Sequence, residues 1–343
     1  MRYLWLDGLR GVAACYVLSF HFFKGSNFFA SFGWTAVDFF FVLSGYVLCN
    51  SMTLAGATGT LGFAKFLKKR ILRLFPVLFL ALSLRLLLQL SESILEFFRG
   101  SVGNTTAFNS SDIIRYLLSI LLLQFLYPFS VSLVFPLWSL STEFYSNLFQ
   151  IIFRLTGSIR KISFGILLGI LLIIASGIYF DSGPDWIQYN TWLFGFGRAL
   201  VGFNIGQLVW NFHQRNFRAS WMQSLFAALV AFVISINVWV FAKEFVLASA
   251  YFSFGFLVLA FSKLKNPAQT SYLFRFLKVL GETSYPVYLF HTILLPLFLR
   301  IFTSLSIVNF ITFYLMNVIF SFLVLKYLEP KVSVFISKYV RVR

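Results

Sequence analysis

The sequence predicts an all-α polytopic membrane protein, and three observations lead to this fold class. Hydrophobic residues make up 59% of the 343 residues and charged residues only 11%, whereas a soluble domain carries roughly a quarter charged residues. The apolar residues form long blocks, most of which reach the roughly 17–25 residues of a spanning helix. Short basic clusters separate the blocks. We therefore expect one membrane-embedded domain at 1–343, with a helical core at 5–328 and a basic cytoplasmic tail at 329–343.

The apolar blocks follow one another along the whole chain. The basic clusters between them face the cytoplasm under the positive-inside rule, so the net charge of +17 indicates orientation. Because no basic stripe lies on a polar face, nucleic-acid binding is not expected. The blocks are 8–24, 33–53, 71–90, 113–127, 136–153, 162–180, 191–210, 221–242, 245–262, 284–304 and 306–328.

Successive spanning helices cross the membrane in opposite directions, and the block at 113–127 does not fit this alternation. The block before it runs outward and the block after it runs inward, so both ends of the stretch 91–135 lie outside. This block is the shortest of the set, and Pro128 follows it. A broken membrane element is tolerated where it is buried in protein or lines a cavity. We therefore expect one re-entrant or interfacial segment and about ten spanning helices, with both termini cytoplasmic.

Ionisable residues inside spanning segments are the strongest functional signal, because they are costly there and usually face a cavity or a partner. In the first helix, Arg10 and His21 are 11 residues apart, which puts them on one face to within about 20°. Asp7 lies near the same face and could instead pair with Arg10 at the interface. His21 lies about 16 Å deeper than Arg10, and histidine is the usual general base near neutral pH.

Two carboxylates lie in later helices. Asp38 stands beside three phenylalanines near a helix start, where it is either functional or an interfacial cap. Glu143 lies seven residues beyond Pro136, inside the helix, and is hard to explain by packing alone. The two cysteines, Cys15 and Cys49, lie in apolar blocks and are expected to pack as small hydrophobes rather than form a disulfide.

Six motifs follow one another along the chain: Asp7–Arg10, the Arg10 and His21 pair, Val37–Gly45, Arg70–Pro76, Leu137–Glu143 and Leu280–His291. In this order they resemble the acyltransferase-3 family of integral-membrane O-acyltransferases, and the resemblance covers nearly the whole chain. It implies a fold of about ten spanning helices, a cytoplasmic acyl-CoA donor, usually acetyl-CoA, and an acceptor that is often a cell-envelope saccharide.

The resemblance also assigns Arg70 and Arg73 to the phosphates of the CoA donor. Their i,i+3 spacing puts both guanidinium groups on one side of the helix. A planar guanidinium group can donate two hydrogen bonds to the oxygens of one phosphate. The plainer interpretation is that this cluster only sets topology or touches anionic lipid. Larger family members carry an appended esterase-like domain, which we do not expect here, so it stays open whether a separate periplasmic or membrane partner completes the transfer.

Acyl transfer to a hydroxyl needs a base and a group that stabilises the thioester oxygen. His21 is the best base, and Arg10 is expected to position the donor. Glu143 or Asp38 could orient the imidazole, and the sequence does not choose between them. Direct transfer and transfer through a transiently acylated residue both stay open. Ser44, Ser139 and Ser141 are the conceivable sites of such an acyl-enzyme intermediate.

The other two histidines are expected outside the catalytic site. His291 shares an i,i+3 stripe with Tyr285 and Tyr288 that is better explained by packing, and His213 lies in a basic loop where we expect it to be solvated. No His, Cys, Asp or Glu cluster has metal-ligand spacing, so no metal site is expected.

The sequence thus predicts an O-acetyltransferase of the bacterial cytoplasmic (inner) membrane, with acetyl-CoA as a donor substrate rather than a resident cofactor. Its expected partners are acyl-CoA, membrane lipids and an envelope glycan or glycolipid, such as O-antigen or exopolysaccharide. The alternative is a transporter or flippase of a lipid-linked saccharide, which would also need intramembrane charges. A non-catalytic scaffold of an envelope assembly complex is a third possibility.

Overall fold

The computed structural model describes residues 3–24, 30–54, 60–98, 108, 110–123, 133–153, 158–179, 192–215, 220–241 and 246–339. In these ranges the chain is all-helical and contains no strand, which confirms the predicted fold class. The helices are α1 (Leu4–Phe23), α2 (Ala36–Leu54), α3 (Thr60–Phe98), α4 (Ser110–Ile120), α5 (Leu137–Ile152), α6 (Ile159–Tyr179), α7 (Trp192–Gln214), α8 (Trp221–Phe241), α9 (Val246–Ser262), α10 (Tyr272–Ile301), α11 (Ile307–Leu323) and α12 (Glu329–Tyr339). A 3₁₀ segment, η1 (Ala30–Thr35), leads into α2, and a π-helical segment, η4 (Val324–Leu328), joins α11 to α12.

Several helices are long and apolar enough to cross a bilayer, as the composition predicts for a multi-pass membrane protein. Within the described residues, five stretches meet both criteria. The number of about ten spans stays a prediction, because α5 and α9 have 16 and 17 residues, at the short end of what a hydrocarbon core of about 30 Å requires. The cytoplasmic location of both termini also stays a prediction. The five stretches are Ala30–Cys49, Leu67–Glu96, Ile159–Ser176, Tyr272–Ile301 and Ile307–Lys338.

Two segments of the predicted topology have a distinct structure. The block expected to re-enter forms α4, whose 11 residues rise only about 16 Å, too short to span. It ends in a turn where Leu122 has a φ of 56°. The basic tail expected at 329–343 is helical over its first 11 residues, as α12. Residues 124–127 of the re-entrant block and the basic residues Arg154, Arg218, Arg341 and Arg343 lie outside the described ranges.

The helices group into two compact units. Unit 1 comprises Met1–Gly59 and Thr142–Tyr285, and unit 2 comprises Thr60–Ser141 and Pro286–Arg343. Each unit is therefore assembled from stretches that lie far apart in the sequence, and the helices α5 and α10 each contribute to both.

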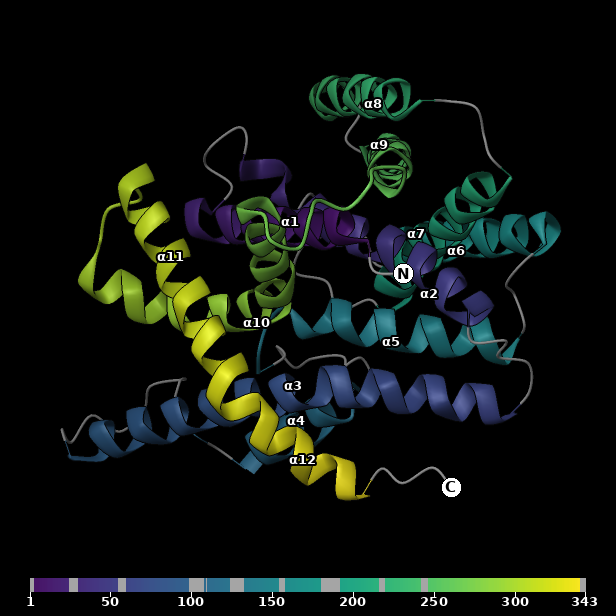
Figure 1. Cartoon of the computed structure of the whole chain (residues 1–343). Coiled ribbons are helices and arrows are strands. Elements are labelled where there is room, and N and C mark those ends of the chain that lie inside the picture. Colours follow the sequence, from purple (N-terminus) through teal and green to yellow (C-terminus); the bar gives the residue numbers. More distant parts are fainter. Residues whose placement is uncertain are drawn as a thin grey trace. The chain divides into compact units, whose positions relative to one another are not determined.

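In unit 1, α2 is the central helix, because 78% of the apolar stretch at Ala30–Cys49, which runs from η1 into α2, is buried, against 22% for Ile159–Ser176 in α6. It packs along α7, and α7 packs along α6, while α9 packs against α8, α7 and α2 (Figure 1). The close packing of α2 on α7 depends on glycine: a Cβ on Gly206 would lie 2.0 Å from the carbonyl oxygen of Val42. Backbone that close leaves no room for a side chain.

We expect Gly206→Ala to destabilise the protein by about 1–3 kcal/mol, because the added methyl group forces the two helix backbones apart. The shift of the unfolding midpoint in detergent measures this cost. Gly255→Ala in α9 is the matched control, since its Cβ would meet only side-chain carbons, the nearest at 3.3 Å. Equal midpoints for the two variants would contradict the account.

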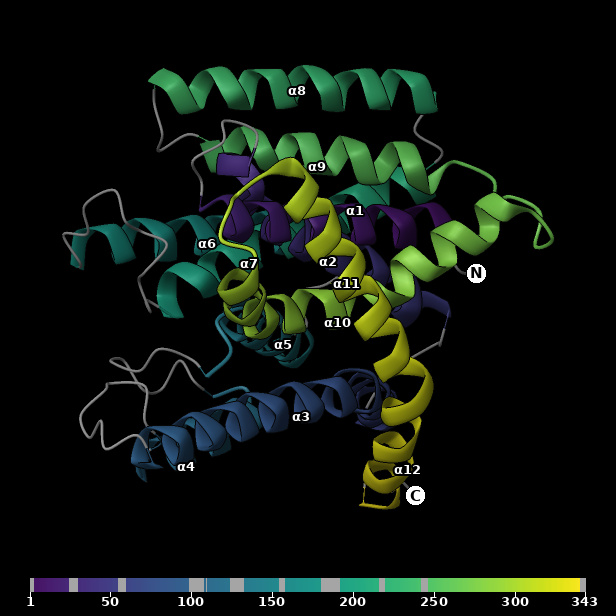
Figure 2. The same cartoon turned by 90° about the vertical axis from the view of Figure 1, so that its left-hand side faces the viewer.

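In unit 2, the 39-residue helix α3 is the longest element, and α12 packs across it (Figures 1 and 2). The short helix α4 also packs on α3, and η4 carries the chain from α11 into α12. Pro76 lies inside α3 without ending it. This unit holds the Arg70 and Arg73 pair that the sequence assigns to the donor.

Candidate active site

Arg10 is anchored between two helices of unit 1. Its Nη2 donates to the carbonyl oxygen of Gly281 and to Ser284 Oγ, both at 3.1 Å, and its Nη1 lies 3.5 Å from Asp7 Oδ1. Ser284 Oγ in turn donates to the Gly281 carbonyl at 2.7 Å. Because both partners belong to α10, the guanidinium fixes α1 against α10, and Asp7 only assists. The interfacial Asp7 pair considered from the sequence is therefore one part of a larger network.

The approach of α10 to α1 has a local cause in the sequence. A Cβ on Gly281 would lie 2.6 Å from Asp7 Cβ, so only glycine lets the two backbones come this close. The Gly281 carbonyl is thereby brought within reach of the Arg10 side chain. The motif at Leu280–His291 thus contributes a backbone acceptor to Arg10 as well as side chains.

His21 lies in the last turn of α1, at the opposite end of that helix from Arg10. The side chain is half-buried, and the ring of Phe20 meets the imidazole edge-on, with 5.2 Å between the ring centroids. The helix ends just after it, where Lys24 adopts a left-handed conformation with a φ of 50°. An imidazole at a helix end, partly covered by an aromatic ring, can exchange a proton with a neighbouring hydroxyl.

Glu143 accepts a hydrogen bond from a different helix of the same unit. Ser44 Oγ in α2 donates to Glu143 Oε1 at 2.7 Å, and Asn147 Nδ2 donates to the Glu143 main-chain oxygen at 2.9 Å. The sequence singled out both Ser44 and Glu143, but the side chains are 99 positions apart in the chain and the pattern gave no reason to join them. The hydroxyl fixes the direction of the carboxylate.

A row of buried polar side chains continues along α5 from Glu143. Ser146, Asn147 and Gln150 are each at most 1% exposed, and their spacing of i, i+3, i+4 and i+7 relative to Glu143 puts them on one face. Gln150 Oε1 accepts from Nε2 of Gln207 in α7 at 3.2 Å. Such a polar layer between apolar helices is costly unless it serves a site, which marks the α2, α5 and α7 region of unit 1 as functional.

Asp38 is fully buried and bonded on both carboxylate oxygens. Arg198 Nε donates to Oδ1 at 3.1 Å, Arg198 Nη2 donates to Oδ2 at 2.7 Å, and the Tyr251 hydroxyl donates to Oδ1 at 2.8 Å. Trp34 and Phe194 cover the guanidinium, with ring centroids 5.2 and 5.4 Å from its carbon. Asp38 thus joins α2, α7 and α9 and is not an exposed interfacial cap.

Arg198 and Tyr251 are residues of this network that sequence reasoning missed. One signal was present in the pattern: Arg198 lies inside the apolar block at 191–210, where a cation requires an anionic partner. Its partner, however, lies 160 positions away, and no helical periodicity connects the two.

The remaining candidates belong to unit 2. Arg70 is half-buried and Arg73 exposed, three residues apart on α3. Ser139 Oγ lies 2.6 Å from the Tyr288 hydroxyl and donates to the Pro136 carbonyl at 2.9 Å. Ser141 Oγ donates to the Leu122 carbonyl. Both serines are therefore bonded within their own unit.

The two further histidines and the cysteines have defined surroundings. His291 is buried, and its Nδ1 lies 3.2 Å from the Val287 carbonyl, as the packing interpretation expects. His213 is not simply solvated: its Nδ1 lies 2.6 Å from the Tyr46 hydroxyl, and the two rings are stacked. Neither Cys15 nor Cys49 forms a disulfide. Among the residues that the structure describes, no group of three His, Cys, Asp or Glu side chains could hold a metal ion.

All four residues that the sequence proposed for catalysis belong to unit 1: Arg10, His21, Asp38 and Glu143. The donor-binding pair, Arg70 and Arg73, belongs to unit 2. Polar partners from another helix fix the positions of Arg10, Asp38 and Glu143. The structure bonds these three side chains into separate networks, with α10, with Arg198 and Tyr251, and with Ser44. A shared catalytic site for them and His21 therefore stays a prediction.

The family profile of an acyltransferase domain, that of the acyltransferase-3 family, matches residues 3–326. The chain belongs to the acyltransferase-3 family. The match covers every helix that carries a candidate residue, and it confirms the resemblance found in the motifs. Membership of this family and the apolar helices together indicate a multi-pass membrane protein of an acyltransferase family.

A relative from Rhizobium radiobacter, "Protein 2 in picA locus", is 41% identical over 86 residues, which cover 24% of this chain and 44% of the relative. The chain therefore matches less than half the length of that protein. No solved structure matches the acyltransferase-3 chain.

Proposed function

We propose that the protein is a membrane O-acyltransferase of the bacterial inner membrane. It moves an acyl group, acetyl in the main proposal, from cytoplasmic acyl-CoA to a hydroxyl of an envelope saccharide such as O-antigen or exopolysaccharide. The observation that carries this proposal is helix α1, which bears the half-buried His21 and the anchored Arg10 in a chain of the acyltransferase-3 family. A saccharide transporter needs neither a histidine base nor a guanidinium that positions an acyl donor.

The chemistry assigns a role to each side chain. His21 takes the proton of the acceptor hydroxyl as its oxygen attacks the thioester carbonyl. The carbon–sulfur bond then breaks, the ester forms, and the CoA thiolate receives a proton, so that protons balance. Arg10, about three turns from His21 along α1, positions the donor. Glu143, held by Ser44 at 2.7 Å, or Asp38 orients the imidazole.

The donor binds through its phosphates to Arg70 and Arg73 in this proposal. Planar guanidinium groups suit phosphate oxygens, and the exposed Arg73 is accessible to a soluble ligand. A separate periplasmic or membrane partner would present the acceptor if the chain does not bind it alone.

Replacing both arginines by alanine should raise the KM for acyl-CoA by at least about tenfold and leave kcat within a few-fold, because the charge-assisted bonds to phosphate act mainly on binding. Steady-state kinetics with purified protein in lipid nanodiscs measures both constants. Arg275→Ala, an exposed arginine in α10, is the control for the loss of positive charge. An unchanged KM in the double variant would remove the assignment.

Labelled acetyl-CoA tests the function itself. Membranes that contain the protein, incubated with [¹⁴C]acetyl-CoA and an envelope glycan, should gain alkali-labile label on the glycan, and membranes that contain His21→Ala should not. A transporter or flippase would leave the glycan unlabelled in both samples. Mass spectrometry of envelope glycans from cells with and without the active protein then identifies the acceptor and the size of the acyl group.

A further inference from the structure

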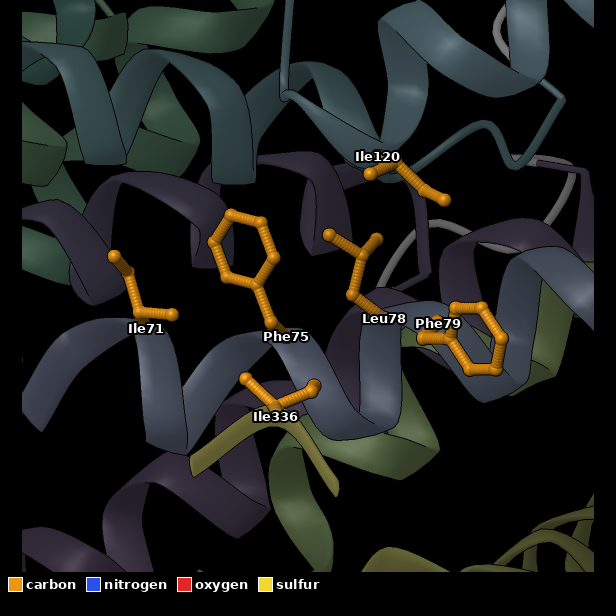
Figure 3. Close-up of a pocket in the computed structure, with 6 residues that line it drawn as sticks. All are labelled: Ile71, Phe75, Leu78, Phe79, Ile120 and Ile336. Carbon is orange, nitrogen blue, oxygen red and sulfur yellow. The ribbon is translucent and has the colours of Figure 1, made fainter. Parts of the chain in front are cut away.

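An apolar groove lies on unit 2, and none of the side chains that line it is assigned to catalysis or donor binding. Its volume is about 300 Å³, at the lower end of the range for ligand sites. Figure 3 shows four of its side chains in a row along α3, with one side chain of α4 and one of α12 on either side of them. The lining residues are Ile71, Phe75, Leu78, Phe79, Ile120 and Ile336.

The α3 face of the groove begins at a lysine. Lys68 precedes Phe75 by seven residues, which puts the two side chains on the same face of the helix to within about 20° and about 10 Å apart along it. Lys69 follows and is exposed. The apolar row and the cation therefore form one continuous stripe on α3, with the charge at its N-terminal end. No acidic residue occurs in α3 before Glu92.

Helix α12 closes the other side of the groove through Ile336. Both whole-chain views show the last turns of α12 beside the N-terminal half of α3 (Figures 1 and 2). Lys338, two residues after Ile336, lies on the opposite face of α12 and is exposed. Val334 and Phe335 of the same helix are each 60% exposed. A helix that presents apolar side chains and lysines together is typical of a membrane interface.

We propose that this groove binds one acyl chain of an anionic phospholipid, whose phosphate pairs with Lys68. The wholly apolar lining suits a hydrocarbon chain and provides no side-chain partner for a peptide backbone. Lys68 at one end supplies the charge complementarity that selects an anionic headgroup over a zwitterionic one. The site uses none of the side chains assigned to acyl transfer, and it holds a specific lipid against α3, α4 and α12.

Photo-crosslinking tests the proposal on the full-length protein in phosphatidylcholine vesicles. The vesicles carry a trace of either phosphatidylglycerol or phosphatidylcholine with a diazirine near the end of one acyl chain. The phosphatidylglycerol probe should label peptides that contain residues 71–79 and 336 about fivefold more than the phosphatidylcholine probe, the factor expected for one lysine at an anionic headgroup. Peptides of α6, whose Leu167 and Leu171 are exposed apolar residues, serve as the internal reference.

Two variants separate headgroup from chain binding. Lys68→Glu should reduce labelling by the phosphatidylglycerol probe to the phosphatidylcholine level, while Lys278→Glu, at an exposed lysine of α10, should leave it unchanged. Ile336→Trp should fill the groove and reduce labelling by both probes relative to α6. Equal labelling of α3 and α6, equal labelling by the two probes in the unaltered protein, or crosslinks between two copies of the chain in place of lipid would each overturn the proposal.

Discussion

Replacing His21 by alanine is expected to abolish acyl transfer while the protein stays in the membrane at its normal level. A positioned general base contributes about 10²–10⁴-fold to the rate, so the loss should be at least about 100-fold and should appear in kcat. The imidazole lies in the last turn of α1 and is half-buried, so its removal opens no large core cavity. The measurement is label transferred from [¹⁴C]acetyl-CoA, normalised to the amount of protein in the membrane.

His213→Ala is the control for the loss of a histidine that is also half-buried. His213 contacts Tyr46 and has no role in the proposed chemistry, so that variant should keep its activity. Acyl transfer by His21→Ala at more than about a tenth of the normal rate would contradict the role of general base. If replacing His21 and Arg10 had no effect on acylation of the glycan in cells, the protein would instead serve as a scaffold.

The fold was predictable to the extent that hydropathy determines it. The block at 162–180 corresponds to α6 and the block at 306–328 contains α11, because a run of apolar residues long enough to span forms a helix to satisfy its backbone. The bounds of α3 were not predictable in this way. The helix extends at both ends beyond the block at 71–90, since the flanking Lys, Leu and Glu residues are good helix formers that hydropathy alone does not count.

The candidate site was predictable as a set of residues but not as a set of contacts. Asp38 and Glu143 stood out because carboxylates are rare in apolar segments. Their partners Arg198 and Ser44 lie 160 and 99 positions away. Helical periodicity relates positions within one helix only, so which helices pack together, and hence which charges meet, follows from the tertiary structure.

The groove on unit 2 was beyond prediction for the same reason. Its α3 face can be read from the spacing of Ile71, Phe75 and Leu78, but the same spacing also suits contact with any neighbouring helix. Only the positions of α4 and α12 turn that stripe into a groove.

Arg198→Ala is expected to cause the largest loss of stability, about 3–5 kcal/mol, because it leaves the fully buried Asp38 carboxylate without its cation. Arg198 is 5% exposed and Asp38 0%, so solvent cannot replace the lost partner. The free energy of unfolding, measured by denaturant titration in detergent micelles, tests this value. Arg300→Ala is the matched control: Arg300 pairs with Glu92 at the same distance of 2.7 Å but is 65% exposed, and an exposed pair contributes at most about 1 kcal/mol.

The double variant Asp38→Leu/Arg198→Met should be markedly more stable than Arg198→Ala, because removing both charges removes the cost of burying one of them alone. A double variant as unstable as the single one would show that the ion pair is not the reason for the loss of stability.

The same double variant tests which carboxylate, Asp38 or Glu143, orients His21 in the proposed reaction. If the folded double variant still transfers acyl groups, Asp38 serves only to join α2, α7 and α9, and Glu143 is the carboxylate that orients His21. Loss of transfer at normal stability would instead make Asp38 the partner of the imidazole.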